Sequence, residues 1–123
     1  MGTPIRRETR AYESDTDILS GLFYPAGTGA ITGQVNTANL KTAARTATGK
    51  ITLTFPCNFQ KIYFASAKLN MGTPDGTYAQ IDSMVQTSGL LVVVIGTYSA
   101  AHSAADVPAV ATNFVAWELQ VKR

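Results

Sequence analysis

The sequence predicts an all-β fold, either an antiparallel β-sandwich or a jelly-roll-like barrel, built from about six or seven strands. From Ile31 onward, apolar and polar residues alternate with the period of two that a half-buried strand requires. Turn-forming clusters rich in Gly, Pro, Ser and Thr separate these segments at intervals of about eight to twelve residues, as in sandwiches and barrels. The chain shows no convincing apolar spacing of an amphipathic helix.

Residues 90–95, Leu-Leu-Val-Val-Val-Ile, form the most uniformly apolar stretch and lie between Gly89 and Gly96. Short apolar runs rich in β-branched residues and bounded by turn residues are typical of strands that are buried on both faces. The run is too short to span a bilayer. We therefore expect residues 90–95 to be a strand that is covered on both faces and forms the middle of the core.

Residues 45–55 predict a hairpin that turns at Thr48 and Gly49. The apolar side chains after this turn are expected to share one face of the second strand: Ile51, Leu53 and Phe55. Residues 62–69 predict the next strand, and their blurred alternation indicates that both of its faces are covered.

Residues 78–85 predict a strand that a turn at residues 87–89 joins to the apolar run. Residues 99–111 are rich in Ala, but Pro108 and small polar residues favour a loop there. Residues 115–121 predict the last strand, whose inward-facing side chains are Val115, Trp117, Leu119 and Val121. Trp117 is therefore expected to anchor the core.

The chain divides into an extended N-terminal arm and linker, residues 1–30, and a β-sandwich domain, residues 31–123. A disordered terminus is an equal alternative for residues 1–12. The apolar part of the arm, residues 18–25, is expected to become ordered by burial against this domain or a partner. The residues expected to contact a partner are Arg6, Arg7, Arg10, Tyr12, Leu22, Phe23 and Tyr24.

The composition excludes several classes of site. A single cysteine, Cys57, rules out an intramolecular disulfide and a cysteine-rich zinc site, so a structural thiol is expected. The formal net charge of +2 is too mild to indicate nucleic-acid binding. The sequence carries no recognisable secretory signal. We expect no cofactor, no metal, no membrane partner and no enzymatic activity.

His102 is the one histidine, and Ser99, Ser103 and Asp106 lie near it in sequence. A hydrolase triad requires three groups that converge in space beside an oxyanion hole, which neighbours on one loop do not provide. We therefore expect His102 to be an exposed loop residue. Asp82 and Glu118 are expected to be surface charges.

The hairpin at residues 45–55, the apolar run at residues 90–95, the loop that contains Asp106 and the closing strand at residues 115–121 together resemble small virion structural proteins of tailed bacteriophages. Head decoration (cement) proteins are the most similar members. The resemblance covers residues 45–123 and transfers no catalytic residue. It implies a protein of the virion, located on the capsid surface and assembled in the host cytoplasm. The implied partners are the major capsid protein, whose neighbouring subunits it would cement, and copies of the chain itself, with a trimer preferred.

A different class remains open, a receptor- or glycan-binding β-module of a phage tail or fibre. Such a module needs an exposed aromatic platform in a loop, and residues 99–111 contain no aromatic residue other than His102. A small hydrolase that uses His102 is the third alternative.

Overall fold

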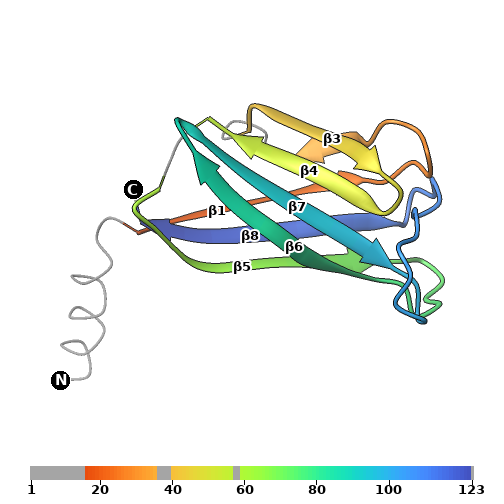
Figure 1. Ribbon diagram of the computed structural model, residues 1–123. Coiled ribbons are helices and arrows are strands. Elements are labelled where there is room, and N and C mark those ends of the chain that lie inside the picture. The colour runs from red at the N-terminus through yellow and green to blue at the C-terminus, as the bar shows by residue number, and fades with distance from the viewer. Residues whose placement is uncertain (1–15, 36–39, 57–58, 123) are drawn as a thin grey trace, which may run out of the picture.

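The computed structural model of the chain describes residues 16–35, 40–56 and 59–122. These segments contain eight strands in two antiparallel four-stranded sheets that pack face to face (Figure 1), which confirms the predicted antiparallel β-sandwich. Sheet A has the strand order β2-β1-β8-β5, and sheet B has the order β3-β4-β7-β6. The strands are β1 (Thr16–Tyr24), β2 (Thr32–Val35), β3 (Thr42–Ala47), β4 (Lys50–Phe55), β5 (Lys61–Asn70), β6 (Tyr78–Thr87), β7 (Leu90–Tyr98) and β8 (Phe114–Lys122).

The core lies between the sheets and is formed by every second residue of the central strands. Strand β8 buries Val115, Trp117, Leu119 and Val121, as predicted from their alternation. The indole of Trp117 meets the ring of Phe55 from sheet B edge to face, with centroids 5.6 Å apart. Such aromatic pairs add stabilisation beyond the area that they bury. Trp117 is therefore the core anchor that the sequence predicted.

The predicted hairpin is formed by β3 and β4. Gly49 adopts a positive φ of 65° in the turn, a conformation that glycine reaches at little cost. The predicted apolar face of β4 is buried, namely Ile51, Leu53 and Phe55. Strand β4 then pairs with β7 in the centre of sheet B.

The prediction that residues 90–95 are covered on both faces is wrong. Leu91, Val93 and Ile95 are fully buried, whereas Leu90, Val92 and Val94 are only half-buried on the outer face. No other layer covers that face within the described residues, because the sandwich has two sheets only. The prediction that both faces of residues 62–69 are covered is also wrong, because Phe64 in β5 is 47% exposed. The blurred alternation of this segment reflects an irregularity in register between Ile62 and Phe64.

The N-terminal boundary also differs from the prediction. Thr16–Tyr24, assigned to an arm from the sequence, is strand β1 and pairs with both β8 and β2 inside sheet A. Its apolar residues point to both faces, since Leu19 and Phe23 are buried while Ile18 is 62% exposed. The sandwich therefore begins by Thr16, and only residues 1–15 of the predicted arm lie outside the described residues.

The loop between β7 and β8 folds back over the β3–β4 turn at one end of the sandwich (Figure 1). The amide of Thr97 donates to the carbonyl of Gly49 at 2.8 Å, and the amide of Ala105 donates to the carbonyl of Thr97 at 3.0 Å. The Thr97 hydroxyl donates to the carbonyl of Ala105 at 2.7 Å. Residues 99–111 form the predicted loop, and these bonds place it beside the polar residues of sheet B.

Candidate functional site

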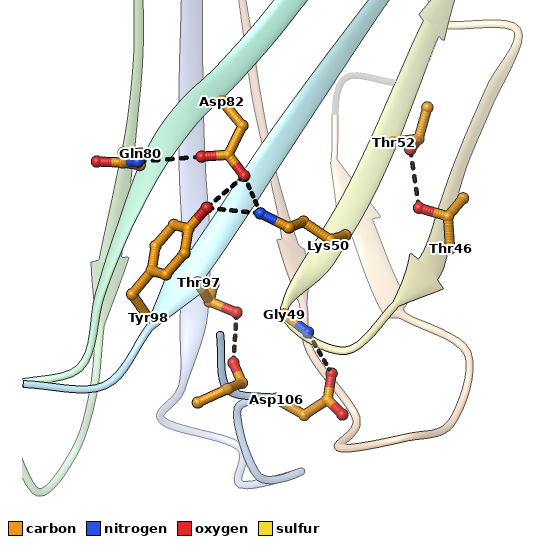
Figure 2. Close-up of polar contacts among 10 residues, drawn as sticks. Thr46, Gly49, Lys50, Thr52, Gln80, Asp82, Thr97, Tyr98 and Asp106 are labelled. Carbon is orange, nitrogen blue, oxygen red and sulfur yellow. Dashed lines mark hydrogen bonds and ion pairs between the residues drawn. The ribbon is translucent and has the colours of Figure 1, made fainter. Parts of the chain in front are cut away.

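Polar side chains gather on the outer face of sheet B near the end that carries this loop. Lys50 begins β4 directly after the Gly49 turn, Tyr98 ends β7, and Asp82 lies at a β-bulge in β6. The register pairs Lys50 with Gly96 and Gly96 with Gln80, so side chains from three strands meet above that glycine. We call Lys50, Asp82, Tyr98 and Gln80 the Lys50 cluster (Figure 2).

Hydrogen bonds and one ion pair connect all four residues of the Lys50 cluster. The Lys50 ammonium forms an ion pair with Asp82 Oδ2 and donates to the hydroxyl of Tyr98 at 2.5 Å. The Tyr98 hydroxyl donates to Asp82 Oδ2 at 2.6 Å, and the Gln80 amide donates to Asp82 Oδ1 at 3.0 Å. Figure 2 shows the closed triangle that Lys50, Asp82 and Tyr98 form.

The electrostatics of the Lys50 cluster favour its charged forms. Burial alone raises the pKa of Asp82, but hydrogen bonds from Lys50, Tyr98 and Gln80 together hold that pKa below its usual value. The hydrogen bond to Asp82, followed by the one to Tyr98, raises the pKa of Lys50. The cluster is therefore a self-neutralising ion pair and adds no net charge to the outer face of sheet B.

The ring of Tyr98 connects the Lys50 cluster to the loop. Lys50 Nζ lies 4.7 Å from the centre of that ring, and the ring of Tyr78 stacks on it with centroids 5.7 Å apart. Tyr78 in turn forms a hydrogen bond with His102 Nδ1 at 2.7 Å. His102 is exposed, as predicted, and adopts a positive φ of 65°.

Asp106 fastens the loop to the β3–β4 hairpin. Its two carboxylate oxygens accept bidentate hydrogen bonds from Arg45 at 2.9 and 2.8 Å, and Oδ1 also accepts from the buried amide of Gly49 at 2.9 Å. The hydrogen bond from Arg45, aided by that amide, lowers the pKa of Asp106. Asp106 therefore holds two segments together that are far apart in the sequence.

The side chains of Asp106, His102 and Ser99, the residues that a hydrolase would use, form hydrogen bonds with other residues instead of with one another. Both oxygens of Asp106 bond Arg45 and Gly49, and His102 Nδ1 bonds Tyr78. The Ser99 hydroxyl accepts from the amide of Ser103 at 3.4 Å. Among the described residues, no group of three or more His, Cys, Asp or Glu side chains is arranged to hold a metal ion.

The structure describes three of the seven predicted partner-contact residues, Leu22, Phe23 and Tyr24. Arg6, Arg7, Arg10 and Tyr12 lie outside the described residues, as does Cys57. Phe23 is 1% exposed and belongs to the core, so in this conformation it is not available to a partner. Tyr24 is half-buried against Phe114, with ring centroids 6.0 Å apart. Leu22 is half-buried and lines a shallow groove on the outer face of sheet A, together with Ser20, Ser66, Lys68, Ala116 and Glu118.

Beyond the Lys50 cluster, the outer face of sheet B carries no charged side chain in the described part of the chain. The register aligns Thr42, Thr54, Val92 and Val85 in one row across the four strands. The next row contains Ala44, Thr52, Val94 and Ser83. We call these two rows the threonine–valine face. Its side chains range from half-buried to exposed, and Val85 is 53% exposed.

Sequence reasoning missed both the Lys50 cluster and the threonine–valine face. Asp82 was expected to be an ordinary surface charge, but its side chain is only 14% exposed and ion-paired. One signal pointed to the cluster: Gly96 interrupts a strand pattern, and such a glycine often marks a bulge or a close approach of other groups.

Among the described residues, no helix is long and apolar enough to cross a membrane. Comparisons of the chain with protein-family models, with curated proteins and with solved structures found no match.

Proposed function

We propose that the chain is a structural protein of a phage virion, which binds the outside of the capsid and cements neighbouring major capsid subunits. The resemblance of residues 45–123 to head decoration proteins motivates the proposal. The observation that carries it is the threonine–valine face, a broad surface without net charge on one side of the sandwich.

A surface of this kind suits contact with another protein. The central parts of protein–protein interfaces are depleted of charged residues, because burying an unpaired charge is costly. The two rows of the threonine–valine face contain only Thr, Val, Ala and Ser side chains. The Lys50 cluster borders this face, and its opposite charges already neutralise each other. We therefore assign the threonine–valine face as the surface that lies on the capsid.

Cementing would follow from many weak contacts. A protein that binds the assembled shell but not its separated subunits stabilises the shell by mass action. Repetition of the same contact over a lattice multiplies a modest affinity. Residues 1–15, with Arg6, Arg7 and Arg10, would extend these contacts to acidic patches on neighbouring subunits.

The test uses purified heads from a virus whose copy of this gene has been deleted. The added wild-type chain is expected to bind these heads in a sedimentation assay and to raise their temperature of disruption. Thr54→Lys places a charge in the threonine–valine face and should weaken binding by at least about tenfold, because the charge would be buried unpaired. Thr73→Lys adds the same charge to an exposed turn and should bind like the wild type.

Failure of the wild-type chain to bind heads, or equal binding by Thr54→Lys and wild type, would overturn the proposal. Binding to a defined sugar on a glycan array, with none to heads, would favour the alternative of a receptor- or glycan-binding module of a tail or fibre.

A further inference from the structure

Strand β6 is an edge strand of sheet B, and the residues of its second half are exposed, although the side-chain amide of Gln86 is bonded to the backbone of Phe59. The topology places β6 at the end of the sheet, with β7 as its hydrogen-bonded neighbour. All five residues from Ser83 to Thr87 are exposed, including Met84 at 40% and Val85 at 53%. An exposed apolar edge strand is a template for pairing with another strand.

The other edges carry the features that normally prevent such pairing. Strand β2 has only four residues, and β3 has an irregular register near Arg45. Strand β5 carries Lys61 and Lys68 as well as a bulge. Residues 83–87, in contrast, contain no charge, no proline and no break in register. Among the described edges, the second half of β6 is therefore the one best suited to accept a strand.

The hairpin geometry indicates which backbone groups of β6 point outward. Thr87 and Leu90 flank the two-residue turn at Ser88 and Gly89, where the flanking pair exchanges backbone hydrogen bonds. Hydrogen-bonded and non-hydrogen-bonded pairs alternate along an antiparallel ladder. The N–H and C=O groups of Met84 and Gln86 are therefore directed away from β7, toward the open edge.

We propose that a second copy of the chain pairs with this edge, antiparallel and about a two-fold axis that passes between the two Val85 residues. In this register Met84 of each copy exchanges backbone hydrogen bonds with Gln86 of the other. The two Val85 side chains then lie directly opposite each other. Two four-stranded sheets become one continuous eight-stranded sheet.

Charge and surface continuity favour a second copy as the occupant. Residues 83–87 meet only their own uncharged counterparts in this register, and Asp82, just beyond them, is already paired with Lys50. A two-fold axis perpendicular to the sheet keeps both outer faces on the same side. The row that ends at Val85 in one copy then continues from Val85 to Thr42 in the next, so the uncharged surface doubles in width.

The predicted dimer is weak in isolation. A pairing of about five residues along one strand buries much less surface than the roughly 800 Å² that each partner buries in a standard interface. We therefore expect self-association of the full chain in the micromolar range, measurable by sedimentation over a wide concentration series. This association does not depend on capsid binding, so its test is independent of the proposed function.

The experiment places charges on the two-fold axis. Val85→Lys and Val85→Glu each juxtapose like charges and should weaken self-association by at least about tenfold. An equimolar mixture of the two variants places opposite charges at the axis and should recover association to about the wild-type level. Val110→Lys changes an equally exposed valine in a loop and should associate like the wild type. Circular dichroism checks that each variant folds.

The proposal is overturned if the wild-type chain remains monomeric throughout the series, or if it forms a trimer that Val85→Lys leaves intact. Failure of the mixed Val85 variants to associate would also overturn it, because the two-fold register requires their rescue.

Discussion

Gly96 lies directly beneath the carboxylate of Asp82. A Cβ atom built at Gly96 would fall 2.2 Å from Asp82 Oδ2 and 2.6 Å from the ring of Tyr98. Since real Cβ atoms do not approach other atoms so closely, Asp82 and Tyr98 can occupy these positions only because residue 96 has no side chain. The absence of a side chain at residue 96 thus leaves room for the Lys50 cluster above it.

Gly96→Ala should therefore destabilise the fold. The new methyl group displaces Asp82 and Tyr98, and overpacking of this kind costs about 1–3 kcal/mol. Urea denaturation followed by circular dichroism measures the loss of unfolding free energy. The same substitution in an Asp82→Ala background should cost less, because the closest contact has been removed. Equal costs in both backgrounds would show that the Asp82 contact is not the cause.

Stability should fall on acidification because of Asp82 and Asp106. The pKa of each carboxyl is lower in the folded state than its ordinary value, so each contributes stability that is present above the unfolded pKa, about 3.9. That contribution is lost as the pH falls through the folded pKa. Asp82→Asn and Asp106→Asn should each flatten the decline of unfolding free energy between about pH 5 and pH 2. Wild-type slopes in both variants would contradict the assignment.

Asp106→Ala should loosen the loop from the hairpin. The substitution leaves the buried amide of Gly49 without its acceptor, and an unsatisfied buried donor costs about 1–3 kcal/mol. Hydrogen exchange at the Gly49 amide measures the effect locally, and we expect faster exchange in the variant. Asp75→Ala, which removes an acceptor in an exposed turn, is the control and should leave exchange at Gly49 unchanged.

Some strands of this fold could be predicted from the sequence and others could not. Residues 45–55 and 115–121 were predictable because one face of each strand is buried and their alternation is regular. Thr16–Tyr24 was missed as a strand because apolar residues occupy both of its faces. Ile18 is exposed on one face and Leu19 is buried on the other, so polar and apolar residues do not alternate. A local irregularity in β5 had the same effect.

The Lys50 cluster was hidden for a different reason. Lys50 and Asp82 are 32 positions apart, and only the register of β4, β7 and β6 brings them together. Gly96 was interpreted as the end of a strand, whereas β7 continues to Tyr98. Sequence pattern indicates which face a residue occupies, but the neighbours across a sheet follow from strand order, which the pattern does not contain.

Substitutions at His102 can separate the energetic effect of its strained backbone from that of its side-chain hydrogen bond. It adopts a φ of 65°, a left-handed conformation that costs a non-glycine residue roughly 1–2 kcal/mol, and its ring bonds Tyr78. His102→Ala and His102→Gly both remove the bond to Tyr78, but only glycine relieves the strain. We therefore expect the glycine variant to exceed the alanine variant in unfolding free energy by about 1 kcal/mol, measured by urea denaturation. Equal stability of the two variants would mean that the loop abandons this conformation once the hydrogen bond to Tyr78 is lost.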